Sequence, residues 1–400
     1  MKYTRYLPER GWRVSVITPE ASTHPITDAM LESQIPPQTR VVRTRALNTK
    51  RDLSILGRYP ALLALPDTWI GWLPFAVAAG RRLFADDGVD LVYSTSPHAT
   101  AHLIAGRLAA ISRKPWVTDF RDPWIEDPPE PGTPNGPVFR TVNRWLERRV
   151  VSRCDTVVTS TNQLRDEMHR RYPDQRADKF RAILNGYDEA DFRDLALAPS
   201  RPGPRLRIVH AGSINAQFRD PRPLFDALGR MVRAGRLVAS EVELCFMGGG
   251  PYGDAPEVRA SIAQAGLTDS VAFLPRVPYD ESLRQLSGAD LLLLLQASDD
   301  TVGLVPAKLY EYLRTRKPVL ALVRQGAVSE VMAKTGGGWC TDPDHAESLD
   351  AAVARIVQSW RSDDLAAHAA DMAELSRFDR RALAGELADV FDLVSRRRVA

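Results

Sequence analysis

The sequence predicts an α/β protein made of two doubly wound, Rossmann-like domains that face each other across a cleft. Three observations support this fold class. Strand patterns alternate with helix patterns along both halves of the 400-residue chain, which is typical of parallel sheets built from βαβ units. A chain of this length exceeds what one hydrophobic core usually supports. A proline-rich segment, residues 198–204, separates the halves and shows neither a helix nor a strand pattern.

The first predicted domain, residues 1–197, contains six strand patterns with helices between them. The strands are Arg13–Thr18, Arg40–Thr44, Leu91–Thr95, Trp116–Asp119, Thr156–Ser160 and Phe180–Leu184. The helices Ala99–Ile111 and Val138–Ser152 fit between them. Because each strand is followed by a helix or a loop long enough to cross over, we expect the strands to be parallel.

The start of the chain is unusual for this fold class. Residues 3–11 have the pattern of a helix that ends at Gly11, and a strand follows directly. A doubly wound sheet normally begins with a strand, and that first strand lies in its centre. We therefore expect that the true start lies upstream, and that the strands flanking the missing one lack their ladder partners.

The second predicted domain, residues 205–376, repeats the alternation. Its strands are Arg205–Ala211, Glu241–Met247, Val271–Leu274, Leu291–Leu295, Val319–Val323 and Gly338–Thr341. An amphipathic helix, Arg380–Arg398, closes the chain within residues 377–400. We expect this last segment to cross back to the first domain.

Residues 290–323 form the most informative stretch. Five leucines, Leu291–Leu295, indicate a strand buried on both faces. A polar loop follows, in which Gly303 permits close backbone approach and Pro306 suits the first turn of a helix. Such a loop offers free backbone N–H groups at a helix N-terminus, which favours an anion site. The carboxylate of Glu311, on the helix that follows, can accept hydrogen bonds from both hydroxyl groups of a sugar diol. The alternative interpretation is that Glu311 is a solvated residue on an ordinary helix.

Composition and charge give no support for nucleic-acid binding or for a zinc site. The 53 basic and 50 acidic residues leave a formal charge of +3, and no basic run supports nucleic-acid binding. Cys154, Cys245 and Cys340 lie far apart, so we interpret them as small core residues of a reducing compartment, not as zinc ligands.

No signal peptide is visible, and the most apolar segment, residues 69–80, is too short to span a membrane. Trp69 and Trp72, followed by Arg81 and Arg82, are compatible with contact to a membrane surface. A helix packed on a sheet explains the same residues. We expect a cytoplasmic protein that is at most peripheral on the inner face of the plasma membrane.

Short motifs then occur in the order and spacing of a known family. They are residues 6–11, 94–98, 119–124, 185–188, 210–212, 248–251 and 306–313. Together they resemble the family 4 glycosyltransferases of the two-domain GT-B fold, over nearly the whole chain. The Ser94–His98 and Asp119–Trp124 motifs resemble a subgroup that builds bacterial surface polysaccharides.

The resemblance implies transfer of a sugar from a nucleoside-diphosphate sugar to a glycan or lipid-linked acceptor, with retention and without a metal or other cofactor. The family's E-x7-E motif places its second glutamate on the nucleotide ribose, and Glu311 matches that position. The first glutamate would stand at Gly303, so that carboxylate is absent. Asp299 or Asp300 could replace it from the loop.

Other donor-binding residues follow from the same resemblance. Arg219, seven residues after Gly212, matches the family's basic residue on the diphosphate, and Lys308 could reach a phosphate. The remaining candidates are Gly248 and Gly249 in a donor loop, Arg276 and Val277 in a base-contacting loop, and Gly303 with Leu304. Arg219 and Lys308 could instead simply face solvent. The glycines could instead serve only to form tight turns.

For the acceptor, the resemblance implies that the catalytic residue lies in the loop after the Trp116–Asp119 strand. Asp122 could act as a base or orient the acceptor, with Arg121 beside it. An Arg121–Asp122 ion pair that caps the strand is the alternative. His98, at a helix start beyond a strand end, is a second candidate for the cleft, although a solvated histidine explains it equally. His102 lies four residues later, without a third metal ligand nearby in sequence.

Two other functions stay open. A nucleotide-sugar 2-epimerase has the same fold but needs catalytic groups in other loops. A non-catalytic relative that binds nucleotide or glycan in an assembly complex is favoured by the absent first glutamate and the absent first strand.

Overall fold

A computed structural model describes residues 2–23, 28, 32–54, 59, 61–125, 136–195 and 203–397. The chain forms two compact units, Met1–Leu184 with Arg380–Ala400, and Asn185–Asp379. Most of the predicted linker, residues 198–202, lies outside the described residues. Residues 185–195 group with the second unit instead of the first, and the terminal segment 380–400 groups with the first.

The second unit is built on a six-stranded parallel sheet with the strand order β12-β11-β10-β7-β8-β9. Its strands are β7 (Leu206–Ala211), β8 (Val242–Met247), β9 (Val271–Leu274), β10 (Leu291–Gln296), β11 (Val319–Val323) and β12 (Gly338–Thr341). All six predicted strands are confirmed. The strand order reverses between β7 and β10, which makes their carboxyl ends the place where this fold class binds ligands.

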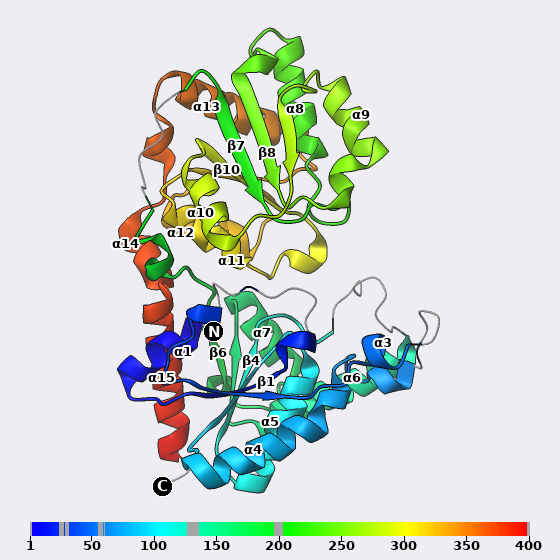
Figure 1. Cartoon of the computed structure of the whole chain (residues 1–400). Coiled ribbons are helices and arrows are strands. Elements are labelled where there is room, and N and C mark those ends of the chain that lie inside the picture. The colour runs from blue at the N-terminus through cyan, green and yellow to red at the C-terminus, as the bar shows by residue number, and fades with distance from the viewer. Residues whose placement is uncertain are drawn as a thin grey trace. The chain divides into compact units, whose positions relative to one another are not determined.

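Helices cover both faces of this sheet (Figure 1). They are α8 (Arg222–Arg233), α9 (Pro256–Gln264), α10 (Tyr279–Ser287), α11 (Ala307–Arg314), α12 (Ala327–Thr335), α13 (Ala346–Arg361) and α14 (Met372–Leu375). α8 packs against both α9 and α13 on one face. The five leucines of β10 are at most 2% exposed, because helices cover the strand on both sides. The prediction of a fully buried strand is therefore confirmed.

The described residues of the first unit form two sheets. A pair of parallel strands, β1 (Ser15–Pro19) and β2 (Arg40–Thr44), is separate from a four-stranded parallel sheet. The larger sheet has the order β3 (Val92–Thr95), β4 (Trp116–Phe120), β5 (Thr156–Thr159) and β6 (Phe180–Ala182). Among the described strands, β1 pairs with β2 alone and β3 with β4 alone. β1 is half-buried along its whole length, whereas β4 and β5 are fully buried. The upstream start stays a prediction.

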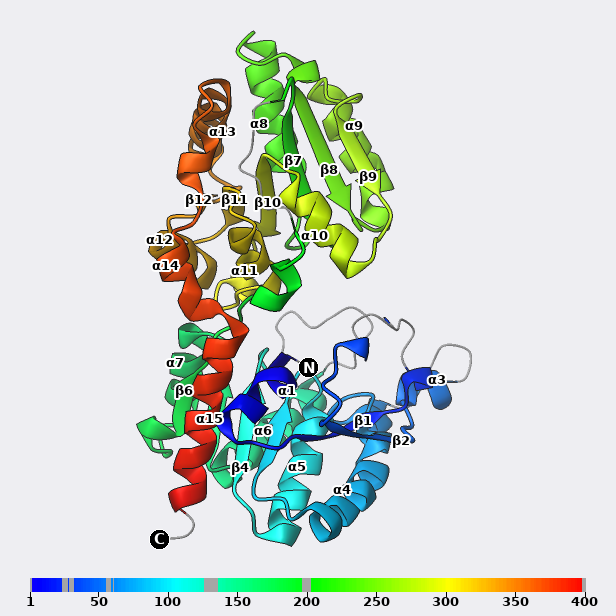
Figure 2. The same ribbon diagram turned by 60° about the vertical axis from the view of Figure 1, so that its left-hand side comes forward.

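The helices of the first unit pack around these strands. They are α1 (Lys2–Tyr6), α3 (Thr49–Asp52), α4 (Leu73–Asp87), α5 (Ala99–Ser112), α6 (Pro137–Arg153), α7 (Asn162–Arg171) and α15 (Arg380–Arg397). As predicted, the first helical segment ends at Gly11, whose φ of +83° is left-handed. Figure 2 shows α15 beside α1. Nε1 of Trp12 donates to Oδ1 of Asp392 over 3.0 Å, which attaches the final helix to the start of the chain.

The cysteines and Trp72 occupy different environments in this fold. Cys154 and Cys245 are buried and free, but Cys340 is exposed, because β12 is the edge strand of its sheet. Nε1 of Trp72 donates to Oγ1 of Thr44 over 2.8 Å, and Trp72 packs against a small apolar cluster that includes Ala76. The interpretation as a helix packed on a sheet therefore explains Trp72.

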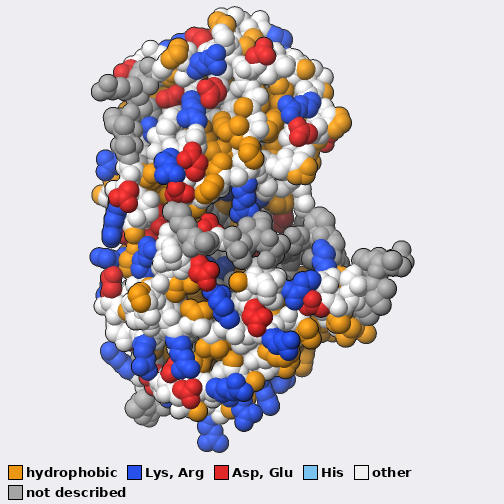
Figure 3. Space-filling model, viewed as in Figure 1, with side chains coloured by type: hydrophobic (Ala, Val, Ile, Leu, Met, Phe, Trp, Pro, Cys, Tyr) orange, Lys and Arg blue, Asp and Glu red, His pale blue; other side chains and the backbone are white. Residues whose placement is uncertain are grey.

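No helix among the described residues is long and apolar enough to cross a membrane. On the face shown in Figure 3, basic and acidic side chains are interspersed over both units. This surface agrees with the nearly balanced charge of the sequence.

Candidate functional site

The carboxyl end of β7 meets the first turn of α11 in the second unit. Gly212 follows β7 with a φ of +117°, and its N–H donates to the carbonyl of Met247 over 2.8 Å. Nζ of Lys308 donates to the carbonyl of Ala211 over 2.9 Å. A Cβ atom at Gly212 would lie 2.7 Å from this Nζ. The backbone conformation at position 212 therefore favours glycine, and a side chain there would displace the Lys308 ammonium group.

The Lys308 ammonium group lies in an unfavourable place for a cation. Burial, and then the positive charge of Arg219, lower the pKa of Lys308 to about 8, while Glu311 acts in the opposite direction. No carboxylate lies within ion-pairing distance of Lys308 or of Arg219 among the described residues. Two partly buried cations without a paired anion favour a negatively charged ligand.

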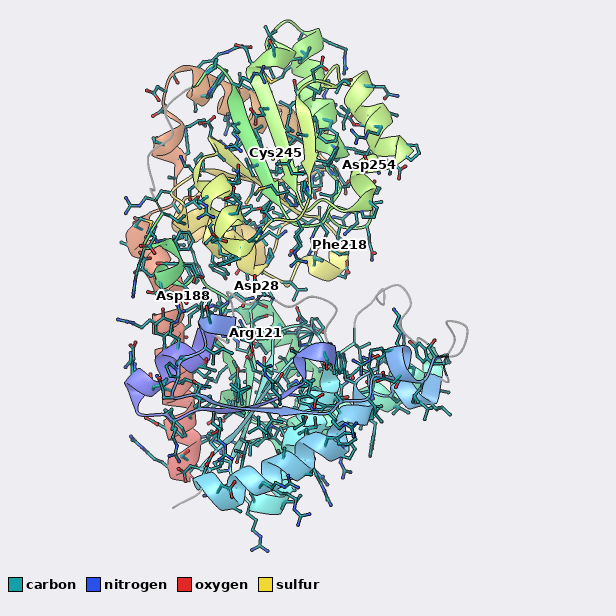
Figure 4. The ribbon with its side chains drawn as sticks, in the orientation of Figure 1. Asp28, Arg121, Asp188, Phe218, Cys245 and Asp254 are labelled. Carbon is teal, nitrogen blue, oxygen red and sulfur yellow. The ribbon has the colours of Figure 1, made fainter. Side chains whose placement is uncertain are left out.

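Arg219 lies in a loop that a neighbouring asparagine shapes. Oδ1 of Asn215 accepts the N–H groups of Gln217, Phe218 and Arg219 at 3.1, 2.9 and 3.3 Å. The Phe218 carbonyl accepts the N–H of Ala297, just after β10, over 2.9 Å. Figure 4 shows Phe218 below the sheet. The loops after the two strands at the point of order reversal are thus bonded together.

The guanidinium group of Arg219 is itself held in a defined position. Its Nη1 donates to Oγ of Ser213 over 3.1 Å, and it lies 4.8 Å from the ring centre of Phe218. Its Nε is buried and has no partner, and burial lowers the pKa of Arg219. An unpaired buried donor is costly unless a ligand supplies an acceptor.

Glu311 faces a network that the sequence analysis did not anticipate. Oε1 of Glu311 accepts from the hydroxyl of Tyr279 over 2.8 Å, and Oδ2 of Asp191 lies 3.1 Å from the same hydroxyl. One residue after Glu311, the Tyr312 hydroxyl accepts the N–H of Ala211 over 2.8 Å. α11 therefore contacts both the end of β7 and the start of α10.

In the loop after β10, the backbone N–H groups are not all free, which differs in part from the prediction. The N–H of Leu304 donates to the carbonyl of Thr301 over 3.0 Å, so this amide is already engaged. Nε2 of Gln296 donates to the Leu304 carbonyl over 3.0 Å, and Nδ2 of Asn185 donates to the Val305 carbonyl over 3.2 Å. Asn185 belongs to the motif of residues 185–188, whereas Gln296 was not singled out in the sequence. Neither contact was predicted.

The carboxylates proposed to replace the first glutamate lie in the same loop. Asp299 forms an ion pair with Arg324, and the Asp299 side chain is 92% exposed. Asp300 is exposed. Asp299 therefore makes a surface ion pair, which is the outcome expected of a charged side chain in a solvated turn.

The loops after β8 and β9 lie against each other. The Gly248 N–H donates to the Leu274 carbonyl over 2.9 Å, and a Cβ atom at Gly248, whose φ is +71°, would lie 3.7 Å from Cα of Arg276. The Gly249 carbonyl accepts the N–H of Ile214, from the loop after β7, over 3.0 Å. Arg276 is exposed and Val277 is half-buried. The predicted donor loops thus adjoin one another within the second unit.

In the first unit, Arg121 forms an ion pair with Asp119 at 3.3 Å, which differs from the pairing with Asp122 considered above. Its Nη1 also donates to the carbonyl of Ile183 over 3.1 Å. The Tyr93 hydroxyl donates to the other oxygen of Asp119. Burial lowers the pKa of Arg121, but the charges of Asp119, Tyr3 and Tyr93 and the hydrogen bond to Asp119 together raise it above its usual value. Figure 4 shows Arg121 above the strands of this unit.

Asp122 lies in the next position of the same loop. Burial raises the pKa of the Asp122 carboxyl group, and the charge of Arg121 partly offsets this effect. Oγ of Ser96 accepts the N–H groups of Arg121 and Asp122 at 2.8 and 3.3 Å. The loops that contain Asp122 and His98 are therefore connected through Ser96.

The two histidines of this unit have different surroundings. His98 is exposed at the N-cap of α5, with its ring 5.4 Å from Trp69. His102 is buried, stacks 4.7 Å from Phe120, and its Nδ1 lies 2.9 Å from Oγ of Ser94. Burial lowers the pKa of His102 to about 3, so its ring is neutral. His102 is a core residue, and His98 is the one at the surface.

Comparisons with known proteins agree with this geometry. The family described as glycosyl transferase 4-like domain matches residues 1–186, and the family described as glycosyl transferases group 1 matches residues 224–374. None of the curated protein sequences matches the chain significantly.

Solved structures share the fold. Sucrose-phosphate synthase from Thermosynechococcus elongatus is 15% identical, with a TM-score of 0.63 over 98% of this chain and 92% of that one. HepE from Anabaena, solved with UDP and glucose, is 17% identical, with a TM-score of 0.64 over 98% and 94%. A Listeria monocytogenes structure assigned as a UDP-N-acetylglucosamine 2-epimerase is 14% identical, with a TM-score of 0.55 over 96% and 90%.

The fold alone is thus compatible with transferases and epimerases. Both matched families are described as glycosyl transferases, and together they cover most of the chain. The chain belongs to the family 4 glycosyltransferases of the GT-B fold, and it is a transferase enzyme.

Proposed function

We propose that the protein transfers a sugar from a nucleoside-diphosphate sugar to a glycan or lipid-linked acceptor in polysaccharide biosynthesis. The observation that carries this proposal is the pair of cations, Lys308 and Arg219, at the carboxyl end of β7. Burial, and then the positive charge of Arg219, depress the pKa of Lys308, and Arg219 has a buried donor without a partner. A diphosphate would supply the missing negative charge and acceptor oxygens.

The other donor contacts follow from the neighbouring loops. Glu311, one helical turn after Lys308, would accept hydrogen bonds from the ribose hydroxyls. Gly212 would let the diphosphate approach the backbone closely, and the loop with Arg276 and Val277 would contact the base. HepE was solved with UDP and glucose, which supports a nucleotide-sugar donor.

The reaction requires stabilisation of the leaving diphosphate as the bond to the sugar breaks. Lys308 and Arg219 provide preorganised positive charge for that group, so a metal ion is not needed for this task. Charge-assisted hydrogen bonds of this kind contribute about 1.5–3 kcal/mol each. We propose retention of the anomeric configuration, as in the family that the chain resembles.

The acceptor would bind the first unit near Asp122. Burial raises the Asp122 pKa, which makes this carboxylate a better base towards an acceptor hydroxyl than an ordinary aspartate. Arg121 is held by Asp119 and Ile183, so it would help to position the loop. His98, exposed at the start of α5, would line the same region.

The proposal is tested by incubating the full chain with UDP-, GDP- and dTDP-sugars, with and without membrane lipid extracts or glycan acceptors. We expect release of free nucleoside diphosphate that depends on the acceptor. The variant K308M should reduce this release, and K334M, which replaces an exposed lysine of α12, serves as its control. Nucleotide binding without release under any condition would identify a non-catalytic relative. Conversion of the donor sugar without an acceptor would identify an epimerase.

A further inference from the structure

The hydroxyl of Tyr279 lies between two carboxylates within the second unit. It is 2.8 Å from Oε1 of Glu311 and 3.1 Å from Oδ2 of Asp191. Burial, and then the negative charges of Glu311 and Asp191, raise the pKa of Tyr279, so the hydroxyl stays protonated. A phenol has one hydrogen to donate. The two carboxylates therefore compete for it, and the shorter distance favours Glu311.

The three residues come from separate elements that other contacts hold in place. Tyr279 begins α10, two residues after Val277 of the proposed base-contacting loop. Asp191 lies in the short 3-10 helix Glu189–Phe192. That helix is attached to α11 by the ion pair of Glu189 with Arg314, whose side chain is only 8% exposed. A second, partly buried contact thus fixes the position of Asp191 relative to α11.

We infer that Tyr279 is a positioning residue for nucleotide binding. It holds one oxygen of Glu311, which restricts rotation of the carboxylate and orients it towards the ribose hydroxyls. This inference rests on the proposed function, in which Glu311 binds the ribose. A carboxylate has about four lone-pair sites, so it can accept from the phenol and from two ribose hydroxyls together. A side chain already restricted loses less entropy when the nucleotide binds.

Asp191 has a different part in this network. Asp191 is the second acceptor, so the Tyr279 hydroxyl donates to Asp191 for part of the time instead of to Glu311. An amide at position 191 could donate to the phenol oxygen, which would leave the Tyr279 hydrogen to Glu311. The two substitutions Y279F and D191N are therefore expected to act in opposite directions.

The test compares a nucleotide that has the ribose diol with one that lacks it. Dissociation constants of UDP and 2′,3′-dideoxy-UDP are measured by calorimetry, with GDP and its dideoxy analogue in parallel. The wild-type protein should prefer the diol. Y279F should weaken binding of the diol nucleotide about fivefold to tenfold and leave the dideoxy nucleotide nearly unchanged. D191N should keep or increase the wild-type preference.

Tyr252 provides a matched control, because its hydroxyl is buried without a partner in the same unit. Y252F should leave both dissociation constants unchanged. If Y279F weakens both nucleotides equally, or if D191N reduces the preference as Y279F does, Tyr279 is structural and the inference is overturned. If the wild-type protein binds both nucleotides equally, the ribose role of Glu311 in the proposed function fails as well. The two failures are therefore distinguishable.

Discussion

Lys308 on the first turn of α11 donates a hydrogen bond from Nζ to the carbonyl oxygen of Ala211, the last residue of β7, over 2.9 Å. This contact places an ammonium group at the reversal point of the strand order, directly over Gly212. Because the cation is partly buried and lies near Arg219, its charge is costly unless an anion binds. Several measurable consequences follow from this position.

K308M should weaken binding of nucleoside diphosphates about 10-fold to 100-fold, because a charge-assisted contact contributes about 1.5–3 kcal/mol. The same variant should not unfold at a lower temperature than the wild type. A lysine whose pKa is lowered on folding binds its proton less tightly in the folded state, so below pH 8 its charge opposes folding. Calorimetry of binding and thermal unfolding at pH 7 check both effects. A clear loss of stability would show that Lys308 is mainly structural.

Nucleotide affinity should depend on pH through the same group. The pKa of Lys308 is about 8 in the free protein, so the ammonium form is lost as pH rises through that value. Binding of a diphosphate should therefore weaken between about pH 7 and pH 9. A titration series in buffers of matched ionic strength measures this slope. In K308M this dependence of affinity on pH should disappear. If it persists in the variant, a group other than Lys308 causes it.

G212A should impair both folding and binding. The added Cβ would lie 2.7 Å from Nζ of Lys308, at a φ of +117° that side chains rarely adopt. We expect a loss of about 1–3 kcal/mol in the free energy of unfolding, and loss of nucleotide binding. Gly235 also has a positive φ but open space around it, so G235A measures the conformational cost alone. Equal effects of the two substitutions on binding would contradict a role for the approach of Lys308.

R219A should reduce turnover more than stability. Its guanidinium group has no carboxylate partner among the described residues, and its Nε is a buried donor without an acceptor. Arg222, which pairs with Asp220 nearby, is the control, and R222A should leave turnover unchanged. Steady-state kinetics and urea unfolding measure the two quantities. A parallel fall in turnover and stability for R219A would make Arg219 structural.

D122N should lower kcat and leave the affinity for nucleotide unchanged, because Asp122 belongs to the first unit and the donor residues to the second. The raised pKa of Asp122 also predicts that activity falls on the acid side at a higher pH than for an ordinary aspartate. A pH–rate profile of the wild type and of D122N measures this fall in activity at acid pH. An unchanged kcat in D122N would exclude Asp122 as the base.

Local patterns in the sequence determined much of this fold. The leucine run Leu291–Leu295, the glycine at position 212 and the helix that contains Lys308 and Glu311 are each readable within about 15 residues, because strand burial, turn conformation and helix starts depend on neighbouring residues. The order of the motifs was enough to identify the family, and six strands of the second unit were placed correctly.

Tertiary structure alone decided which side chains meet. Arg121 pairs with Asp119 instead of Asp122 and also donates to the Ile183 carbonyl, and Tyr279 joins Glu311 to Asp191. Asp191 and Tyr279 are 88 residues apart in sequence. Contacts over such separations depend on how helices and strands pack, and the periodicity of one segment carries no information about the side chains of another.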